Sequence, residues 1–244
     1  MRRRLSVMKR YIPNQHGAWA MLVLPFLFGL AASQGKWPHI PLFLTWLLLY
    51  LFSFPLLQWT KTRRGDRYRK PVILYAALLL PFAVYMLIAV PQLIWFTLPL
   101  IPLFCINLYY ARTKNERALL NDIAAIVTFS LMVFPVFYIG EGEDWRTAVV
   151  LFAVSMIYFT GTALYVKTII REKKNPKYYY ASIAYHLCFI VFGLWFLPLA
   201  AAPVLAALLL RAIIVPKMGV TPKVTGMLEI GFTLMLFLVI LFNM

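Results

Sequence analysis

Long runs of apolar residues, separated by short polar connections, fill most of the chain and predict membrane-spanning helices. About 20 apolar residues that rise 1.5 Å each cross the ~30 Å hydrocarbon core of a bilayer. No polar connection is long enough to fold a separate soluble domain, so we expect a single all-α transmembrane domain over residues 1–244. It would contain about nine spans, at residues 17–33, 40–59, 72–90, 93–110, 120–140, 148–170, 179–196, 198–215 and 225–243.

Composition agrees with a polytopic membrane protein. Of the 244 residues, 63% are hydrophobic and 13% are charged, whereas soluble domains are about 25% charged. The basic segment 1–12 is interpreted as a cytoplasmic tail, because the first apolar run lacks the small-residue cleavage site of a signal peptide and further spans follow. Cys105 and Cys188 lie inside apolar runs, fit no metal or redox spacing and are expected to be packing residues.

The net charge of +16 follows the expected topology rather than a nucleic-acid surface. Of the 24 Lys and Arg residues, all but Lys36 and Arg146 lie in the tail or in and beside the even-numbered connections. The positive-inside rule therefore places the N-terminus in the cytoplasm and the C-terminus outside, as an odd number of spans also requires. We expect a multi-pass protein of a plasma membrane. Its partner would be the lipid bilayer and not nucleic acid, since no module of interleaved aromatic and basic residues is present.

Polar residues within the spans gather on the predicted cytoplasmic side, whereas the outer half is mostly aliphatic and aromatic. Charges inside a bilayer are costly unless they are paired or hydrated. The one-sided distribution therefore predicts a cavity that opens to the cytoplasm, whereas transporters more often place polar groups at the midplane. The polar residues of that side are Asn14, Gln15, His16, Gln58, Trp59, Asn121, Asp122, Lys167, His186, Arg211 and Glu229.

Single residues of this set have different interpretations. Lys167 and Arg211 are long enough either to snorkel to the interface or to line a site, and the sequence leaves both open. Asp122 and Glu229 are too short to snorkel far, so we expect each to have a buried partner or to belong to a site. His186 is interpreted as a hydrogen-bonded core histidine. No cluster of His, Cys, Asp or Glu has the spacing of a metal site, so none is predicted.

The first span opens with the polar sequence PNQHGAWA, which begins at Pro13. Asn14 is expected to cap the helix, and Gly17 would allow a close approach between helices. Gln15 and His16 are predicted to line the rim of the cytoplasmic cavity. Haem ligation by His16 and His186 is an alternative for these two histidines.

Three connections of the cytoplasmic side combine cations, tyrosines and amides, namely residues 56–71, 107–125 and 161–180. Such groups suit a phosphate or another anionic head, and they also suit an anionic membrane surface. Within the second connection, a continuous helix would pair Arg112 with Glu116 at i,i+4.

The same spacing joins Arg117 to Asn121 and Lys167 to Arg171. Each residue of such a pair can hold the other in place if the segment is helical. Together with the polar residues of the spans, these connections define the candidates for ligand binding. They are Gln15, His16, Tyr110, Arg112, Glu116, Arg117, Asn121, Asp122, Lys167, Arg171 and Glu229.

Three stretches, PNQHGAWAMLVLPFLFG, YYARTKNERALLNDIAA and LYVKTIIREKKN, resemble the YwiC-like family of bacterial integral membrane proteins, a resemblance that implies no particular reaction. The plan of spans is also similar to the UbiA superfamily of intramembrane prenyltransferases. That similarity implies a nine-helix bundle whose cytoplasmic cavity is capped by the connections after the second, fourth and sixth helices. It also implies an isoprenoid diphosphate bound through Mg²⁺ by Asp-rich motifs.

The sequence departs from those motifs. Gln58, Trp59 and Thr62 stand where the first motif has Asn, Asp and Asp, and Asp66 alone matches. In the region of the second motif, cations replace the carboxylates that Mg²⁺ requires as ligands. Tyr110 to Arg112 resembles the tyrosine–basic segment that contacts diphosphate in the superfamily. We therefore expect neither bound Mg²⁺ nor metal-dependent prenyl transfer, and we name no catalytic residue or cofactor.

The favoured hypothesis is a protein that binds an isoprenoid, a quinone or an anionic lipid in a cavity facing the cytoplasm. Whether it also catalyses a reaction is left open. One alternative is a transporter or permease for a small solute, suggested by the ionisable residues within the spans. Another is a structural or assembly partner of a membrane complex.

Overall fold

The structure is a computed structural model that describes residues 11–13, 16–173 and 175–244, with His16 described by its backbone only. The prediction of an all-α membrane protein is confirmed, since no strand occurs among the described residues. The helices are α2 (His16–Ala31), α3 (His39–Thr62), α4 (Gly65–Ala89), α5 (Leu93–Thr97), α6 (Leu100–Arg112), α7 (Leu119–Ser130), α8 (Val133–Ile139), α9 (Trp145–Ile170), α10 (Pro176–Phe196), α11 (Ala202–Ile214) and α12 (Pro222–Leu241).

Among the described residues, eight helical segments are long and apolar enough to span a membrane, and α2 is a shorter apolar helix. Two of the eight, α5–α6 and α7–α8, contain a break that the apolar pattern does not reveal. Prolines cause these breaks. Pro102 and Pro135 lack an N–H, and their rings clash with the carbonyl four residues earlier, at Leu98 and Leu131. The two 3₁₀ turns η1 (Leu199–Ala201) and η2 (Val215–Lys217) flank α11.

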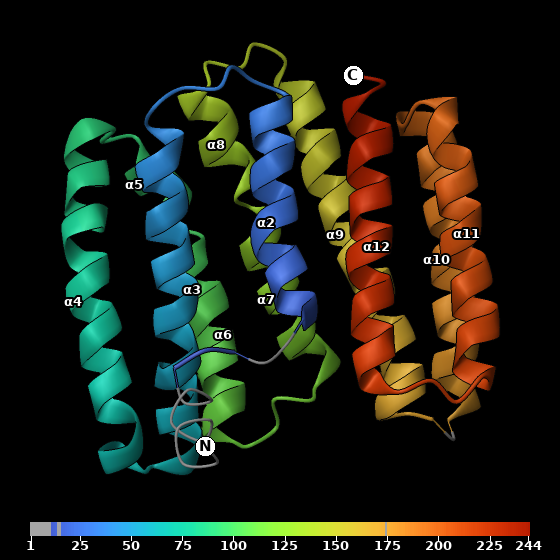
Figure 1. Cartoon of the computed structure of the whole chain (residues 1–244), viewed down its shortest axis with the longest axis horizontal. Helices are drawn as coiled ribbons and strands as arrows, with labels where there is room; N and C mark the ends of the chain where they lie inside the picture. Colours follow the sequence, from blue (N-terminus) through green and yellow to red (C-terminus); the bar gives the residue numbers. More distant parts are fainter. Residues whose placement is uncertain (1–10, 14–15, 174) are drawn as a thin grey trace.

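Successive spans run antiparallel, so alternate connections meet at the same end of the bundle (Figure 1). The connections α3–α4, α6–α7, α9–α10 and α11–α12 lie at the lower end of Figure 1, which we call the basic end. The described chain starts near this end and finishes at the opposite one. The side of a membrane that the basic end faces stays a prediction. The exposed cations of the basic end are Arg63, Arg64, Arg67, Arg69, Lys70, Arg112, Lys114, Arg117, Arg171, Lys173, Lys177, Lys217 and Lys223.

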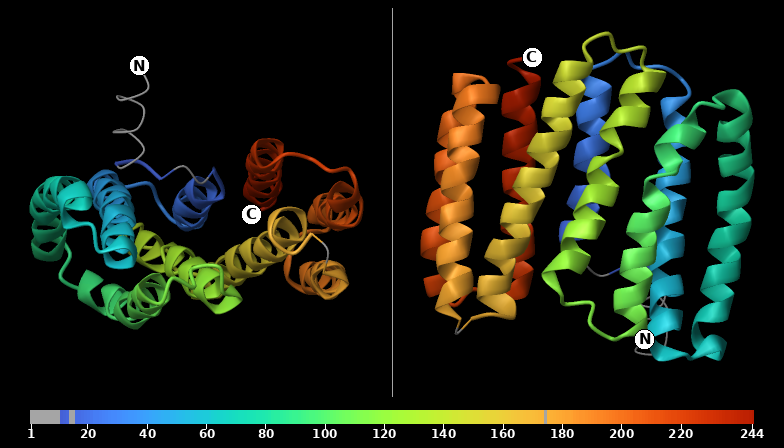
Figure 2. Two further views of the ribbon diagram at one scale, coloured as in Figure 1. Left: turned by 90° about the horizontal axis from the view of Figure 1, so that it is seen from below. Right: turned by 180° about the vertical axis from the view of Figure 1, so that it is seen from behind.

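Helix α2 is central to the packing. Seen from below, α3 to α6 lie on one side of it and α9 to α12 on the other (Figure 2). Its Leu24 and Phe28 belong to the hydrophobic core with α9–α12, whereas Leu22 and Phe26 belong to the core with α3 and α8. A Cβ on Gly29 would come within 2.7 Å of a backbone oxygen of α8, so this position keeps α2 and α8 close.

Candidate functional site

A buried lysine holds several elements together at the basic end. Lys167, in the last turn of α9, is only 5% exposed, so it does not snorkel. Its Nζ lies 2.8 Å from Oδ2 of Asp122 in α7 and donates a hydrogen bond of 2.6 Å to the carbonyl oxygen of Arg117. The expectation of a buried partner for Asp122 is therefore confirmed. One ammonium group joins the end of α9 to the start of α7 and to the loop before α7.

Amide and carboxylate groups extend this arrangement to α3 and α6. Nδ2 of Asn107 donates to Oδ1 and to the backbone oxygen of Asn121, at 2.9 and 3.0 Å. Nδ2 of Asn121 donates to the carbonyl oxygen of Glu116 at 3.0 Å, and the Glu116 carboxylate forms an ion pair with Lys61. We call this group the basal cluster, which consists of Lys61, Asn107, Glu116, Asn121, Asp122 and Lys167.

The helical pairings expected within residues 107–125 are wrong. Helix α6 ends at Arg112, and residues 113–118 form turns in which Lys114 has a positive φ of 58°. A left-handed residue interrupts a helix, so Glu116 does not follow Arg112 by one helical turn and pairs with Lys61 of α3 instead. Asn121 likewise bonds Asn107 rather than the arginine four residues before it.

Three arginines of the basic end differ from the paired residues of the basal cluster. Arg112, Arg117 and Arg171 are exposed, and they form no ion pair with any residue that the structure describes. Arg117 is fixed at its backbone by Lys167, and Arg171 is the C-cap of the helix that carries Lys167. The two exposed guanidinium groups therefore belong to segments that the Lys167–Asp122 pair joins.

The remaining candidates at this end are less informative. Tyr110 is half-buried in α6 and lies edge-on to Tyr109. Gln15 and the proposed cap Asn14 fall outside the described residues, as does the side chain of His16. Their placement at the rim of a cavity stays a prediction.

A second polar group lies deeper, among α9, α10, α11 and α12, and we call it the inner network. Arg211 and Glu229 are each 3% exposed and form an ion pair through Nη1 and Oε2. Thr162 donates to the same Oε2 at 3.1 Å. The expectation of a buried partner for Glu229 is therefore confirmed, and Arg211 does not snorkel. The network consists of Tyr158, Thr162, Tyr165, Ser182, His186, Arg211, Glu229 and Thr233.

Hydrogen bonds fix the protonation state of His186, which is 2% exposed. Its Nδ1 lies 2.7 Å from the carbonyl oxygen of Ser182, and because a carbonyl can only accept, Nδ1 carries the proton. Its Nε2 lies 3.2 Å from Nη2 of Arg211, which can only donate, so Nε2 accepts. His186 is therefore the neutral Nδ1–H tautomer. The interpretation of a hydrogen-bonded core histidine is confirmed, since both ring nitrogens have partners within the protein. The haem alternative also involves the side chain of His16, which lies outside the described residues.

Small residues and hydroxyls complete the network. A Cβ on Gly161 would lie 3.3 Å from the ring of His186, so this glycine lets the imidazole rest against α9. Tyr158 shares a hydrogen bond of 2.9 Å with Thr233.

At 1.5 Å per residue, Glu229 and His186 lie about 10 and about 15 Å along their helices from the basic end. This is well inside a ~30 Å hydrocarbon core.

The sequence placed Glu229 among the candidates but did not connect it to Arg211 and His186. Arg211 and His186 are each the only Lys, Arg, His, Asp or Glu residue within the apolar part of their span. Since such residues need a partner in a bilayer, their isolation was the available signal. Which helices are neighbours could not be read from the spacing. Tyr158 and Thr162 carried no signal at all.

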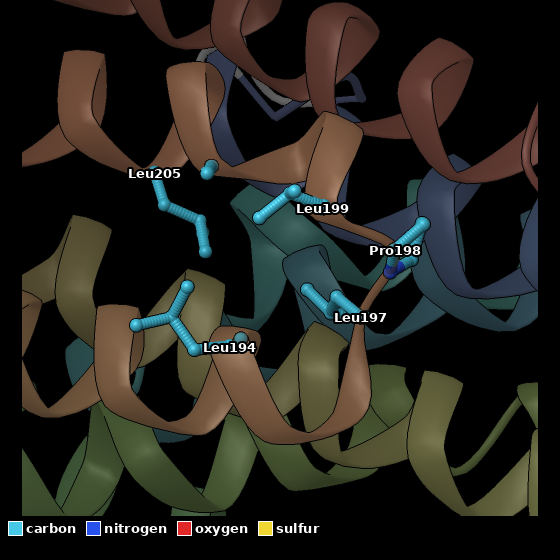
Figure 3. A pocket seen from close by; sticks show the side chains of 7 residues that line it. Leu194, Leu197, Pro198, Leu199 and Leu205 are labelled. Atoms are coloured by element: carbon cyan, nitrogen blue, oxygen red, sulfur yellow. The ribbon is translucent and has the colours of Figure 1, made fainter.

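No group of three or more potential metal ligands occurs within the part of the chain that the structure describes. Neither of two pockets found among the described residues is lined by the candidate residues. One, of about 160 Å³, lies where α10 turns into α11, at the end opposite the basic end, and Leu194, Leu197 and Leu205 line it with other apolar residues (Figure 3). The other, of about 460 Å³, follows one face of α12 from Val224 to Met235.

Known proteins resemble this chain over most of its length. The family described as "YwiC-like protein" matches residues 12–137. The "Uncharacterized protein YwiC" of Bacillus subtilis is 43% identical over 183 residues, which are 74% of this chain and 75% of that protein. An "Uncharacterized protein" of Haemophilus influenzae is 33% identical over 238 residues, 96% of this chain and 98% of that protein. No solved structure matches. The Haemophilus similarity extends over the inner network, which the family match does not reach.

Proposed function

This chain belongs to the YwiC-like family, and from that premise we propose that it is a multi-pass membrane protein that binds an amphiphile by its anionic head at the basic end. Of the ligand classes expected from the sequence, an isoprenoid phosphate or an anionic lipid suits this end, because a neutral quinone offers no charge to the arginines. In this proposal the cationic side chains hold the head directly.

One observation carries the proposal. Arg117 and Arg171 are exposed, have no ion pair among the described residues, and belong to segments that Lys167 joins. Guanidinium groups are the preferred partners of phosphate oxygens, because their planar donors can bind two oxygens at once. Lys167 and Asp122 neutralise each other, so they fix the site without supplying its charge. Arg112, at the end of α6, adds a third exposed cation.

The proposal is tested by lipid titration. Each basic residue near a membrane surface contributes about 1 kcal/mol to the binding of an anionic lipid. Arg117→Gln combined with Arg171→Gln should therefore weaken the binding of phosphatidylglycerol about 30-fold. The measurement is the melting temperature of the purified chain in detergent micelles as phosphatidylglycerol, or phosphatidylcholine, is added.

The matched control is Lys173→Gln combined with Lys177→Gln. Lys173 lies in the α9–α10 connection and Lys177 in the first turn of α10, and both are exposed, so this variant loses the same charge from the same end. It should bind phosphatidylglycerol nearly as the wild type does. Equal losses in the two double variants, or equal stabilisation by phosphatidylcholine, would show that only bulk charge or bulk lipid matters.

The inner network lies deep in the bundle, and this suggests an alternative function, the transport of a small solute. Transporters bind their substrate near the midplane, and alternating access requires a path from that site to both sides of the membrane. In the part of the chain that the structure describes, however, the buried Lys, Arg and Glu residues are Lys167, Arg211 and Glu229. All three lie in the basic-end half of their helices. We therefore rank transport, and a role in complex assembly, behind amphiphile binding.

A further inference from the structure

Four polar atoms of the inner network are buried and have no hydrogen-bond partner among the residues that the structure describes: Nε of Arg211, Oε1 of Glu229, Oη of Tyr165 and Oγ of Ser182. Their residues are at most 3% exposed, and each comes from a different helix of the set α9–α12. A buried polar group without a partner costs about 1–3 kcal/mol. Four such atoms in one network indicate an occupant that supplies the missing hydrogen bonds.

The four residues that carry these atoms are all linked to one guanidinium group, that of Arg211. The Cζ of Arg211 lies 4.3 Å from the centre of the Tyr165 ring, and Nη1 pairs with Glu229. Its Nη2 contacts His186, whose other ring nitrogen donates to the carbonyl of Ser182. Glu229 and Tyr165 therefore contact Arg211 directly. Ser182 is linked to Arg211 through His186.

The chemistry of these atoms defines the occupant. Nε of Arg211 can only donate, and Oε1 of the ionised Glu229 can only accept, so the occupant needs both an acceptor and a donor. The charges of Arg211 and Glu229 compensate each other, and His186 is neutral, so an added ion would be buried without a counter-charge. A neutral hydroxyl group meets both conditions, because one oxygen accepts and donates at once.

An apolar groove lies beside Phe232. This half-buried ring lies 5.0 Å from the Cζ of Arg211, and it also lines the groove of about 460 Å³ on α12. The other lining residues are Val224, Met227, Leu228, Gly231 and Met235, which are apolar. The Phe232 ring therefore contacts both the Arg211 guanidinium and an apolar groove that suits a hydrocarbon tail.

We propose that the inner network is a binding site for a neutral hydroxyl group, which accepts from Nε of Arg211, donates to Oε1 of Glu229 and has the hydroxyl of Tyr165 or Ser182 as its third partner. The hydroxyl belongs either to an amphiphilic alcohol whose tail lies in the α12 groove or to an ordered water molecule. This site is separate from the basic end and does not rest on the function proposed there.

The test compares three probes with one tail. Purified full-length chain in detergent micelles is titrated with 1-dodecanol, with its methyl ether and with dodecanoate, and the melting temperature is recorded. The alcohol should raise the melting temperature, while the ether lacks the donor and the carboxylate carries a charge. Tyr165→Phe combined with Ser182→Ala should raise the concentration of alcohol that gives the half-maximal shift about tenfold, because the third hydrogen bond of the hydroxyl is lost.

A matched control exists in the other half of the molecule. The hydroxyls of Tyr50 and Ser130 are also buried and unpartnered, so Tyr50→Phe combined with Ser130→Ala should leave the alcohol titration unchanged. If the alcohol gives no shift, a high-resolution structure must show ordered water within hydrogen-bonding distance of Nε of Arg211 and Oε1 of Glu229, which supports water as the source. The proposal is overturned if the alcohol shows no advantage over the ether and these atoms have no ordered neighbour. It is also overturned if the control variant loses the alcohol effect equally.

Discussion

The ion pair of Arg211 and Glu229 has almost no contact with solvent, and this fixes how it responds to mutation. Removal of one member leaves the other charge buried and uncompensated, which is far more costly than removal of both. The rings of Tyr165 and Phe232 lie next to the guanidinium, with their centres 4.3 and 5.0 Å from the Cζ of Arg211. Replacing only the carboxylate therefore leaves a cation among apolar groups.

We predict that Glu229→Leu destabilises the protein by about 3–5 kcal/mol, and that adding Arg211→Met recovers most of this loss. The measurement is thermal unfolding of the purified variants in one detergent. Lys61→Met at the half-exposed pair with Glu116 is the control and should have a small effect, since solvent-exposed pairs contribute about 0–1 kcal/mol. A double variant no more stable than Glu229→Leu would mean that the pair is not the reason for the loss.

Some contacts of single residues could be predicted from the sequence because physical chemistry leaves little choice. Asp122 and Glu229 have short acidic side chains inside apolar segments, so a buried partner was predictable. The identities of those partners were not, because helix spacing says which residues share a face but not which helices are neighbours. Arg112 and Glu116 show the opposite failure, since the left-handed Lys114 between them ends the helix on which their pairing depended.

At the scale of elements, helix ends follow from local chemistry. Asn175 and Thr221 accept hydrogen bonds from Lys177 and Val224, and a proline follows each of them at the first helical position. The prolines that break α5–α6 and α7–α8 were visible in the sequence. Hydropathy alone joined these pieces because both sides of each break are apolar.

Asp144 caps the N-terminus of α9 and makes the stability of the fold depend on pH. Its carboxylate accepts hydrogen bonds from the Thr147 hydroxyl at 2.6 Å and from the backbone N–H of Arg146 at 3.0 Å, and these bonds lower the pKa of Asp144 below its ordinary value. A lowered pKa means that the carboxylate stabilises the fold above the pKa of the unfolded chain. That contribution is lost as the pH falls through the lower pKa of the folded state.

We therefore predict that the wild type melts at a higher temperature than Asp144→Asn near neutral pH, and that the difference shrinks as the pH falls below about 4. The comparison uses melting temperatures over a pH series. Glu143→Gln, at the neighbouring exposed carboxylate, should show no such trend. A difference between wild type and Asp144→Asn that is the same at every pH would contradict the role of the charged cap.

At the scale of the whole molecule, the antiparallel spans bring the even-numbered connections, which carry most of the cations, to one end. The alternation of basic connections along the sequence indicated this separation. It could not show that α2 lies between two hydrophobic cores, because that depends on contacts between distant segments. The orientation of the basic end toward the cytoplasm rests on the positive-inside rule and stays a prediction.

Native mass spectrometry of the purified chain tests the central claim, that the basic end holds an anionic amphiphile, most directly. Wild-type protein released from its detergent micelle should retain an anionic amphiphile as a defined added mass. Arg117→Gln combined with Arg171→Gln should lose this mass, and Lys173→Gln combined with Lys177→Gln should keep it. Wild-type protein that emerges free of any amphiphile, or the same added mass at equal abundance in all three proteins, would contradict the account.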